Sequence, residues 1–204
     1  MRISRARMAS IALAAWFFAP AAFAQAPPNP SGEMEFADGA NWVITDPPLT
    51  WEIGQSGVWI IVPSGFVHDK ASIPSRLQSL IQKNGRYTRA AVIHDWLYWS
   101  QRCTRAQADN LFVIAMKESD VGWWDRKVIY RGVRAGGGQA WDYNAASRAR
   151  GEPRFNGPVL PRGNKTWPQV RAELMASNAR DPSLDPRNDY CRFGNSQDVP
   201  GPSG

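Results

Sequence analysis

The chain contains only two histidines, and an aspartate follows each of them directly. His94-Asp95 lies in the middle of TRAAVIHDWLYWS, residues 88–100, a run that is apolar on nearly every side, and His68-Asp69 lies upstream of it. Burying an ionisable pair costs free energy unless the groups are hydrogen-bonded, bound to a metal or neutralised. His94 and Asp95 are therefore candidates for a functional site.

The spacing of these polar residues indicates which of them could act together in such a site. In a helix that advances about 100° per residue, His94 and Tyr98 share a face, and Asp95 points to the next face. The helix thus offers a base on one face and an acidic metal ligand on another. Asp109, on the following helix, can reach His94 if a short turn joins two antiparallel helices, and it would then orient the imidazole.

Other interpretations of the same residues stay open. The polar side chains could form a buried hydrogen-bond network that only stabilises the fold. A zinc site could combine His68 and His94 with nearby carboxylates. Ser72 could act as a nucleophile with His94 and Asp109, although a helix cap also explains a serine at this position.

The elements that must hold these residues indicate an α+β domain, a small antiparallel β-meander packed on a group of four to five helices. Runs rich in Trp, Val, Ile and Thr predict the strands, and apolar residues at helical spacing predict the helices. Ser72 is the expected cap of the first helix, and Thr104 with Gln107 is expected to form a capping box at the third. The expected strands are 41–45, 49–53 and 58–62, and the expected helices are 74–83, 88–100, 104–118, 122–135 and 166–177.

The helix expected over residues 122–135 carries two adjacent tryptophans. We interpret Trp123 and Trp124 as part of its buried stripe, because aromatic residues at helical spacing are more often core than binding site. Three consecutive glycines, residues 136–138, are expected to end this helix. Residues 142–165 are rich in Gly, Pro, Asn and Arg and predict a long loop.

The N-terminus has the features of a signal peptide, because three arginines precede an apolar run and Ala22-Phe23-Ala24 fits a cleavage site. We expect a leader at 1–24, a linker at 25–35, a single globular domain at 36–178 and an extended tail at 179–204. The mature protein would be exported, periplasmic or extracellular, and not membrane-spanning; an uncleaved anchor is the alternative. The net charge of +6 includes the three leader arginines, so no nucleic-acid partner is expected.

Cys103 and Cys191 are the only cysteines in the chain. In an oxidising compartment they are expected to pair, which would pin the tail to the turn after the central helix. Closing so long a loop stabilises by roughly 4 kcal/mol in the chain-entropy model. Two free thiols are the alternative.

Three blocks of residues follow one another along the chain: Asp69-x-x-Ser72-x-Pro74, His94-Asp95-x-x-Tyr98 and Ala108-Asp109-x-x-Phe112-x-x-Ala115-Met116. Together they resemble the phage-associated domain of unknown function 1353. The resemblance covers roughly residues 66–136 and implies an origin shared with genes of tailed phages and bacteria, without a settled activity.

The His-Asp-x-x-Tyr helix is also similar to the helix of secreted phospholipases of the A2 type, above all the bacterial ones. This similarity implies that His94 is the general base, Asp95 a calcium ligand and Asp109 the residue that orients His94. It also implies a hydrogen bond from Tyr98 to Asp109. Calcium prefers several oxygen ligands, so Asp69 and nearby loop carbonyls would have to complete its shell.

The sequence thus favours an exported hydrolase that acts on an ester of lipid or another envelope component through a metal-assisted His/Asp site. Calcium is the expected cofactor, with zinc as the alternative. One competing hypothesis is a non-catalytic, phage-derived envelope or virion-type binding module. The other is a zinc-dependent hydrolase of the cell wall. The oligomeric state does not follow from the sequence.

Overall fold

The computed structural model describes residues 32–69, 87–157 and 164–202. The predicted leader, the helix expected at 74–83 and Ser72 lie outside the described residues. The described residues form small antiparallel sheets packed on helices, so the predicted α+β fold class is confirmed.

The strands form two separate sheets. Three of them pair in the order β1-β2-β5, and the other two form the hairpin β3-β4. The sequence predicted a single meander, and the pairing of β2 with β3 that this requires is wrong. The connection contains Pro47 and Pro48, whose missing N–H groups cannot donate to a ladder. The strands are β1 (Glu33–Glu35), β2 (Trp42–Ile44), β3 (Leu49–Glu52), β4 (Trp59–Val62) and β5 (Val67–His68).

The N-terminal linker expected over residues 25–35 is shorter than predicted, because its last residues form β1. This strand pairs antiparallel with β2, with Met34 opposite Val43. Met34 packs against a small apolar cluster, which gives the strand a hydrophobic anchor that its composition did not reveal.

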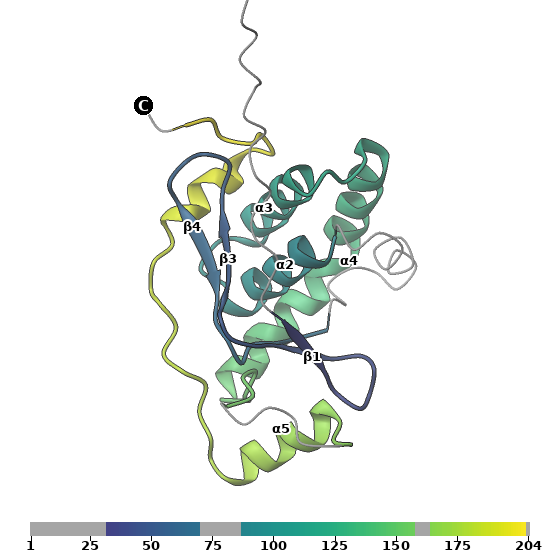
Figure 1. Ribbon diagram of the computed structural model, residues 1–204, viewed down its shortest axis with the longest axis vertical. Coiled ribbons are helices and arrows are strands. Elements are labelled where there is room, and N and C mark those ends of the chain that lie inside the picture. Colours follow the sequence, from purple (N-terminus) through teal and green to yellow (C-terminus); the bar gives the residue numbers. More distant parts are fainter. Residues whose placement is uncertain (1–31, 70–86, 158–163, 203–204) are drawn as a thin grey trace, which may run out of the picture.

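The central helix α2 (Thr88–Ser100) lies between the β3-β4 hairpin and helices α3 (Arg105–Glu118) and α4 (Trp123–Ala149) (Figure 1). The hairpin presents Leu49 and Trp51 to this core, both 1% exposed, as its alternating pattern predicted. Every residue of α2 from Ala90 to Ser100 is buried. The helix that carries His94 is thus covered on all sides.

A capping box starts α3 as predicted. The Thr104 side chain accepts a hydrogen bond from the Gln107 backbone N–H at 3.2 Å, and the Gln107 side chain accepts one from the Thr104 backbone N–H at 2.9 Å. This cap sets where α3 begins after the short turn from α2. It therefore helps to fix the position of Asp109, one turn further along.

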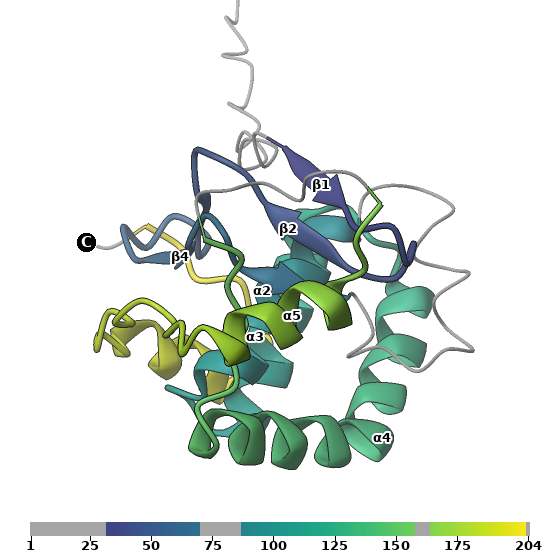
Figure 2. The same ribbon diagram turned by 90° about the horizontal axis from the view of Figure 1, so that it is seen from below.

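Helix α4 is much longer than predicted. It continues through Gly136–Gly138 and ends at Ala149, so the expected stop at these glycines is wrong, as is the first part of the long loop expected at 142–165. Figure 2 shows that α4 changes direction along its length. Gly137 does not end the helix but lets the side chain of Tyr98 lie close to the α4 backbone, because a Cβ there would lie 2.5 Å from the Tyr98 hydroxyl oxygen.

We expect Gly137→Ala to lower the free energy of unfolding by about 1–3 kcal/mol, because Tyr98 is fully buried and cannot move away freely. Gly138→Ala is the matched control. A Cβ at Gly138 meets nothing within 4 Å, so this substitution should stabilise the helix by about 0.5–1 kcal/mol. Urea unfolding followed by circular dichroism measures both. Equal effects of the two substitutions would contradict the close approach at Gly137.

Helix α5 (Trp167–Ala176) agrees with the predicted helix and begins at a second capping box, formed by Thr166 and Gln169. It packs on the three-stranded sheet and lies beside β2 in Figure 2. The cluster between them is separate from the main core and comprises Phe36, Val43, Val67, Trp167 and Val170.

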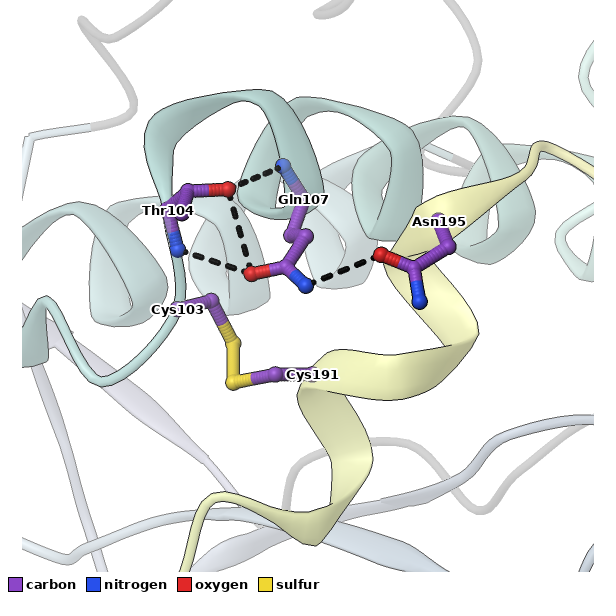
Figure 3. Close-up of a disulfide and its surroundings, with 5 residues drawn as sticks. All are labelled: Cys103, Thr104, Gln107, Cys191 and Asn195. Atoms are coloured by element: carbon purple, nitrogen blue, oxygen red, sulfur yellow. Dashed lines mark hydrogen bonds between the residues drawn. A yellow bond between two sulfur atoms is a disulfide. The ribbon is translucent and has the colours of Figure 1, made fainter.

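The C-terminal segment differs from the predicted extended tail, because residues Asp189–Asn195 form a 3-10 helix, η1, against α3. The predicted disulfide between Cys103 and Cys191 is confirmed and joins η1 to the turn before α3 (Figure 3). The Gln107 side chain also donates to the Asn195 side chain at 3.0 Å. Within the described part of the chain, no helix is long and apolar enough to cross a membrane.

Candidate functional site

The predicted approach of α3 to His94 is confirmed. Nε2 of His94 lies 3.0 Å from Oδ1 of Asp109, and both residues are 0% exposed. Tyr98, one helical turn after His94, donates its hydroxyl to the same oxygen at 2.6 Å. The structure therefore brings together the three residues that the sequence assigned to catalysis.

Two arginines complete this network, and the sequence analysis did not find them. Arg134 on α4 donates to Oδ2 of Asp109 at 2.6 Å, and the Arg105 guanidinium lies 3.7 Å from the same oxygen. Arg105 is four residues before Asp109 on one helix, so its i,i+4 spacing was a usable signal. The contact from Arg134 depends on how α4 packs, and no local sequence pattern predicts it.

The protonation states follow from these contacts. Burial lowers the pKa of His94 below its usual range, although Asp109 opposes this effect. Burial alone would raise the pKa of Asp109, but hydrogen bonds from His94, Tyr98 and Arg134 hold it below its usual value. At neutral pH the pair is thus a neutral imidazole and a carboxylate, with the imidazole proton on Nε2, the donor to Asp109.

This tautomer leaves Nδ1 of His94 as an unprotonated nitrogen. Nδ1 is buried and has no hydrogen-bond partner among the described residues. The ring packs between Tyr98 and Phe112, with centroid distances of 4.1 Å and 4.5 Å. An oriented base with a lone pair on its far side is the arrangement that general-base chemistry requires.

The expected metal ligands are placed as follows. Asp95 is 3% exposed and lies on α2 beside His94. Asp69 follows β5, and its Oδ2 lies 3.7 Å from the Arg154 guanidinium, a cation that competes with any metal for this carboxylate. Among the described residues no three His, Cys, Asp or Glu side chains are grouped closely enough to hold a metal ion. Calcium and zinc therefore stay predictions.

His68 lies in strand β5, where it is 0% exposed. Its Nε2 is 3.5 Å from Oε1 of Glu33, and its ring stacks near Trp42 and Phe66. These contacts tie His68 to the three-stranded sheet. Ser72, the candidate nucleophile or helix cap, is outside the described residues.

Comparison with known proteins finds a family model that matches a segment of the chain, and this segment contains His94, Tyr98 and Asp109. Residues 45–133 match the family described as protein of unknown function (DUF1353), so the resemblance expected from the sequence is confirmed over this segment. No curated protein and no solved structure matches the chain. The similarity to phospholipases of the A2 type consequently has no support beyond the residues themselves.

Proposed function

For a chain whose residues 45–133 match a family of unknown function, we propose an exported hydrolase in which His94 is the general base. The observation that carries this proposal is the buried Nδ1 of His94, which has no partner among the described residues while Nε2 is held by Asp109. Asp109 would orient the ring and stabilise the imidazolium formed when Nδ1 takes a proton from water. The substrate class that we propose is an ester of a lipid or another envelope component.

Tyr98 and Arg134 have supporting roles in this proposal. Both hold the Asp109 carboxylate, and the contact with Asp109 raises the pKa of Arg134, which keeps that guanidinium charged. Asp95 is the carboxylate that would hold a calcium ion, with zinc as the alternative. Such an ion would polarise the ester carbonyl towards the attacking water.

The test is an assay of metal-stripped mature protein on short-chain esters and on phosphatidylglycerol vesicles, with calcium, zinc or a chelator added. His94→Gln keeps an amide donor for Asp109 but has no basic nitrogen, so we expect it to lower the rate at least about a hundredfold. Asp95→Asn should remove any dependence on calcium. Glu118→Gln is a matched control, because this carboxyl also lies on α3 but binds Trp51 at 2.7 Å.

Full activity in His94→Gln would show that His94 is not the general base. If the wild-type protein hydrolyses neither these esters nor peptidoglycan, the hydrolase proposal fails. Loss of activity in both His94→Gln and His68→Gln, with a zinc requirement, would instead favour the zinc-dependent cell-wall hydrolase.

A second candidate function is a non-catalytic, phage-derived binding module. It is favoured by the complete burial of His94 and by the contacts that saturate Asp109, since substrate could reach Nδ1 only if covering residues move. Under this hypothesis the network only stabilises the packing of α2 on α3. His94→Gln would then leave binding to envelope material unchanged in any protein that remains folded.

A further inference from the structure

The two tryptophans at the start of α4 are exposed, contrary to the prediction that they belong to the core. Trp123 is 61% exposed and Trp124 is 65% exposed, whereas Ile129 and Val133 further along α4 are buried. The two indole rings lie side by side, with centroids 5.7 Å apart. Single exposed aromatic side chains are common, but two adjacent ones make a contiguous apolar patch, and such patches mark candidate interaction surfaces.

A groove of about 440 Å³ adjoins this pair, between α3 and the first half of α4. Its floor is apolar at Val113, and Trp123 forms part of its wall. Tyr130 and Gln197 also line it, and the rest of the wall is basic. The cations that line it are Lys117, Arg126, Lys127 and Arg131.

The positive charge of this groove is not neutralised by described residues. Lys117 and Arg126 donate to the backbone carbonyls of Gln197 and Val121, which carry no net charge. Lys127 lies over the Trp123 ring at 4.8 Å from its centroid. Within the ranges that the structure describes, none of the four lining cations has an ion-pair partner.

The acidic residue nearest in sequence is already engaged. Asp125 accepts a hydrogen bond from the Tyr87 hydroxyl at 2.9 Å. Burial, and to a lesser extent this hydrogen bond, raises the pKa of Tyr87 to about 12. Among the described residues, no acidic side chain lines the groove itself. The surface therefore combines exposed indoles, an apolar floor and unbalanced positive charge on one side of the molecule.

We propose that this groove and the Trp123-Trp124 pair form a docking surface for an anionic lipid bilayer. Indole rings partition to the boundary between headgroups and acyl chains, where an apolar body and a polar N–H are both satisfied. Lys and Arg beside them attract anionic headgroups. This surface binds the membrane without help from His94, so the inference does not depend on catalysis.

The same helices connect this surface to the His94 network. Arg131 in the groove is one turn before Arg134, and Val113 is one turn after Asp109. Tyr130 on α4 donates to Asn110, the neighbour of Asp109, at 3.1 Å. Docking through α3 and α4 therefore brings the charged edge of the network close to the lipid surface.

The test is co-sedimentation of the mature protein with vesicles of phosphatidylglycerol and, separately, of phosphatidylcholine. We expect binding to the anionic vesicles only. Trp123→Ala/Trp124→Ala and Lys127→Gln/Arg131→Gln should each weaken it about tenfold or more. His94→Gln should bind as the wild type does, which separates this inference from the proposed hydrolase.

Two control variants make the result specific. Lys165→Gln/Arg180→Gln removes the same charge from exposed sites elsewhere, and Trp59→Ala removes another exposed tryptophan, 46% exposed on β4. Both should bind vesicles as the wild type does. The proposal is overturned if the wild type does not bind phosphatidylglycerol or if both charge variants lose equal affinity. It is also overturned if polyglutamate or a DNA oligonucleotide binds the protein as tightly as the anionic vesicles do and binds the Trp123→Ala/Trp124→Ala variant equally well.

Discussion

Asp109→Ala is expected to lower the free energy of unfolding by about 3–5 kcal/mol. The substitution leaves Nε2–H of His94 and the hydroxyl of Tyr98 buried without an acceptor, and each unmet donor costs about 1–3 kcal/mol. Arg134 and Arg105 add less, because their side chains are 36% and 27% exposed and can turn to water. Urea unfolding at pH 7 measures the change.

Arg134→Gln is the matched control for this prediction, because it removes one partner of Asp109 and leaves the buried donors satisfied. We expect it to cost about 1 kcal/mol or less. If Asp109→Ala costs no more than Arg134→Gln, the buried hydrogen bonds contribute little and the network is not a structural anchor.

The Asp109 carboxylate also gives stability a dependence on pH. Its pKa is lower in the folded protein than the ordinary value of 3.8, so the unfolded chain binds its proton first as the pH falls. This part of the stability is present above that value and is lost as the pH falls through the lower folded pKa. Urea unfolding at several acidic pH values should show a smaller slope in Asp109→Ala, while carboxyls such as Asp38 and Glu152, whose pKa values are also lowered, keep the remainder.

The parts of the fold that could be predicted from the sequence are those set by local signals. The capping box of Thr104 and Gln107 determines where α3 starts, and the i,i+4 spacing of His94 and Tyr98 places them on one face of α2. A short turn between these helices places Asp109 in the first part of α3, where it can reach His94. The core of the site was therefore predictable.

The parts that were missed depend on packing between distant segments. Three glycines in a row ordinarily end a helix, but α4 continues through them, and Gly137 leaves room for the hydroxyl of Tyr98 against its backbone. The same packing turns Trp123 outward and brings Arg134 to Asp109. A periodic pattern shows which helix faces are apolar, but not how far a helix extends or which neighbour it meets.

The C-terminal segment illustrates the same limit, because its polar and Pro-rich composition predicts an extended chain. Two contacts with α3 overcome this tendency: Asn110 donates to the carbonyl of Gly194 at 2.8 Å, and Gln107 donates to Asn195. A Cβ at Gly194 would lie 2.5 Å from the Gln107 carbonyl oxygen, so η1 lies close against α3. Such contacts cannot be read from a local window of sequence.

Removal of the disulfide by Cys103→Ser/Cys191→Ser is expected to lower the free energy of unfolding by about 4 kcal/mol. The bond closes a loop of 88 residues, and opening it restores conformational entropy to the unfolded chain. Wild-type protein reduced with dithiothreitol should give the same loss, which provides an independent route to the same state.

The loss should be accompanied by a local change at η1. Without the bond, two hydrogen bonds to α3 and the packing of Tyr190 and Phe193 on the main core still hold η1. These contacts are weaker than a covalent link, so amide exchange in η1 should accelerate while α2 and α3 stay protected. Hydrogen exchange with mass spectrometry resolves these segments. If the double variant is as stable as the oxidised protein within about 1 kcal/mol, contacts with α3 hold η1 unaided, and the disulfide has no structural role in fixing the tail.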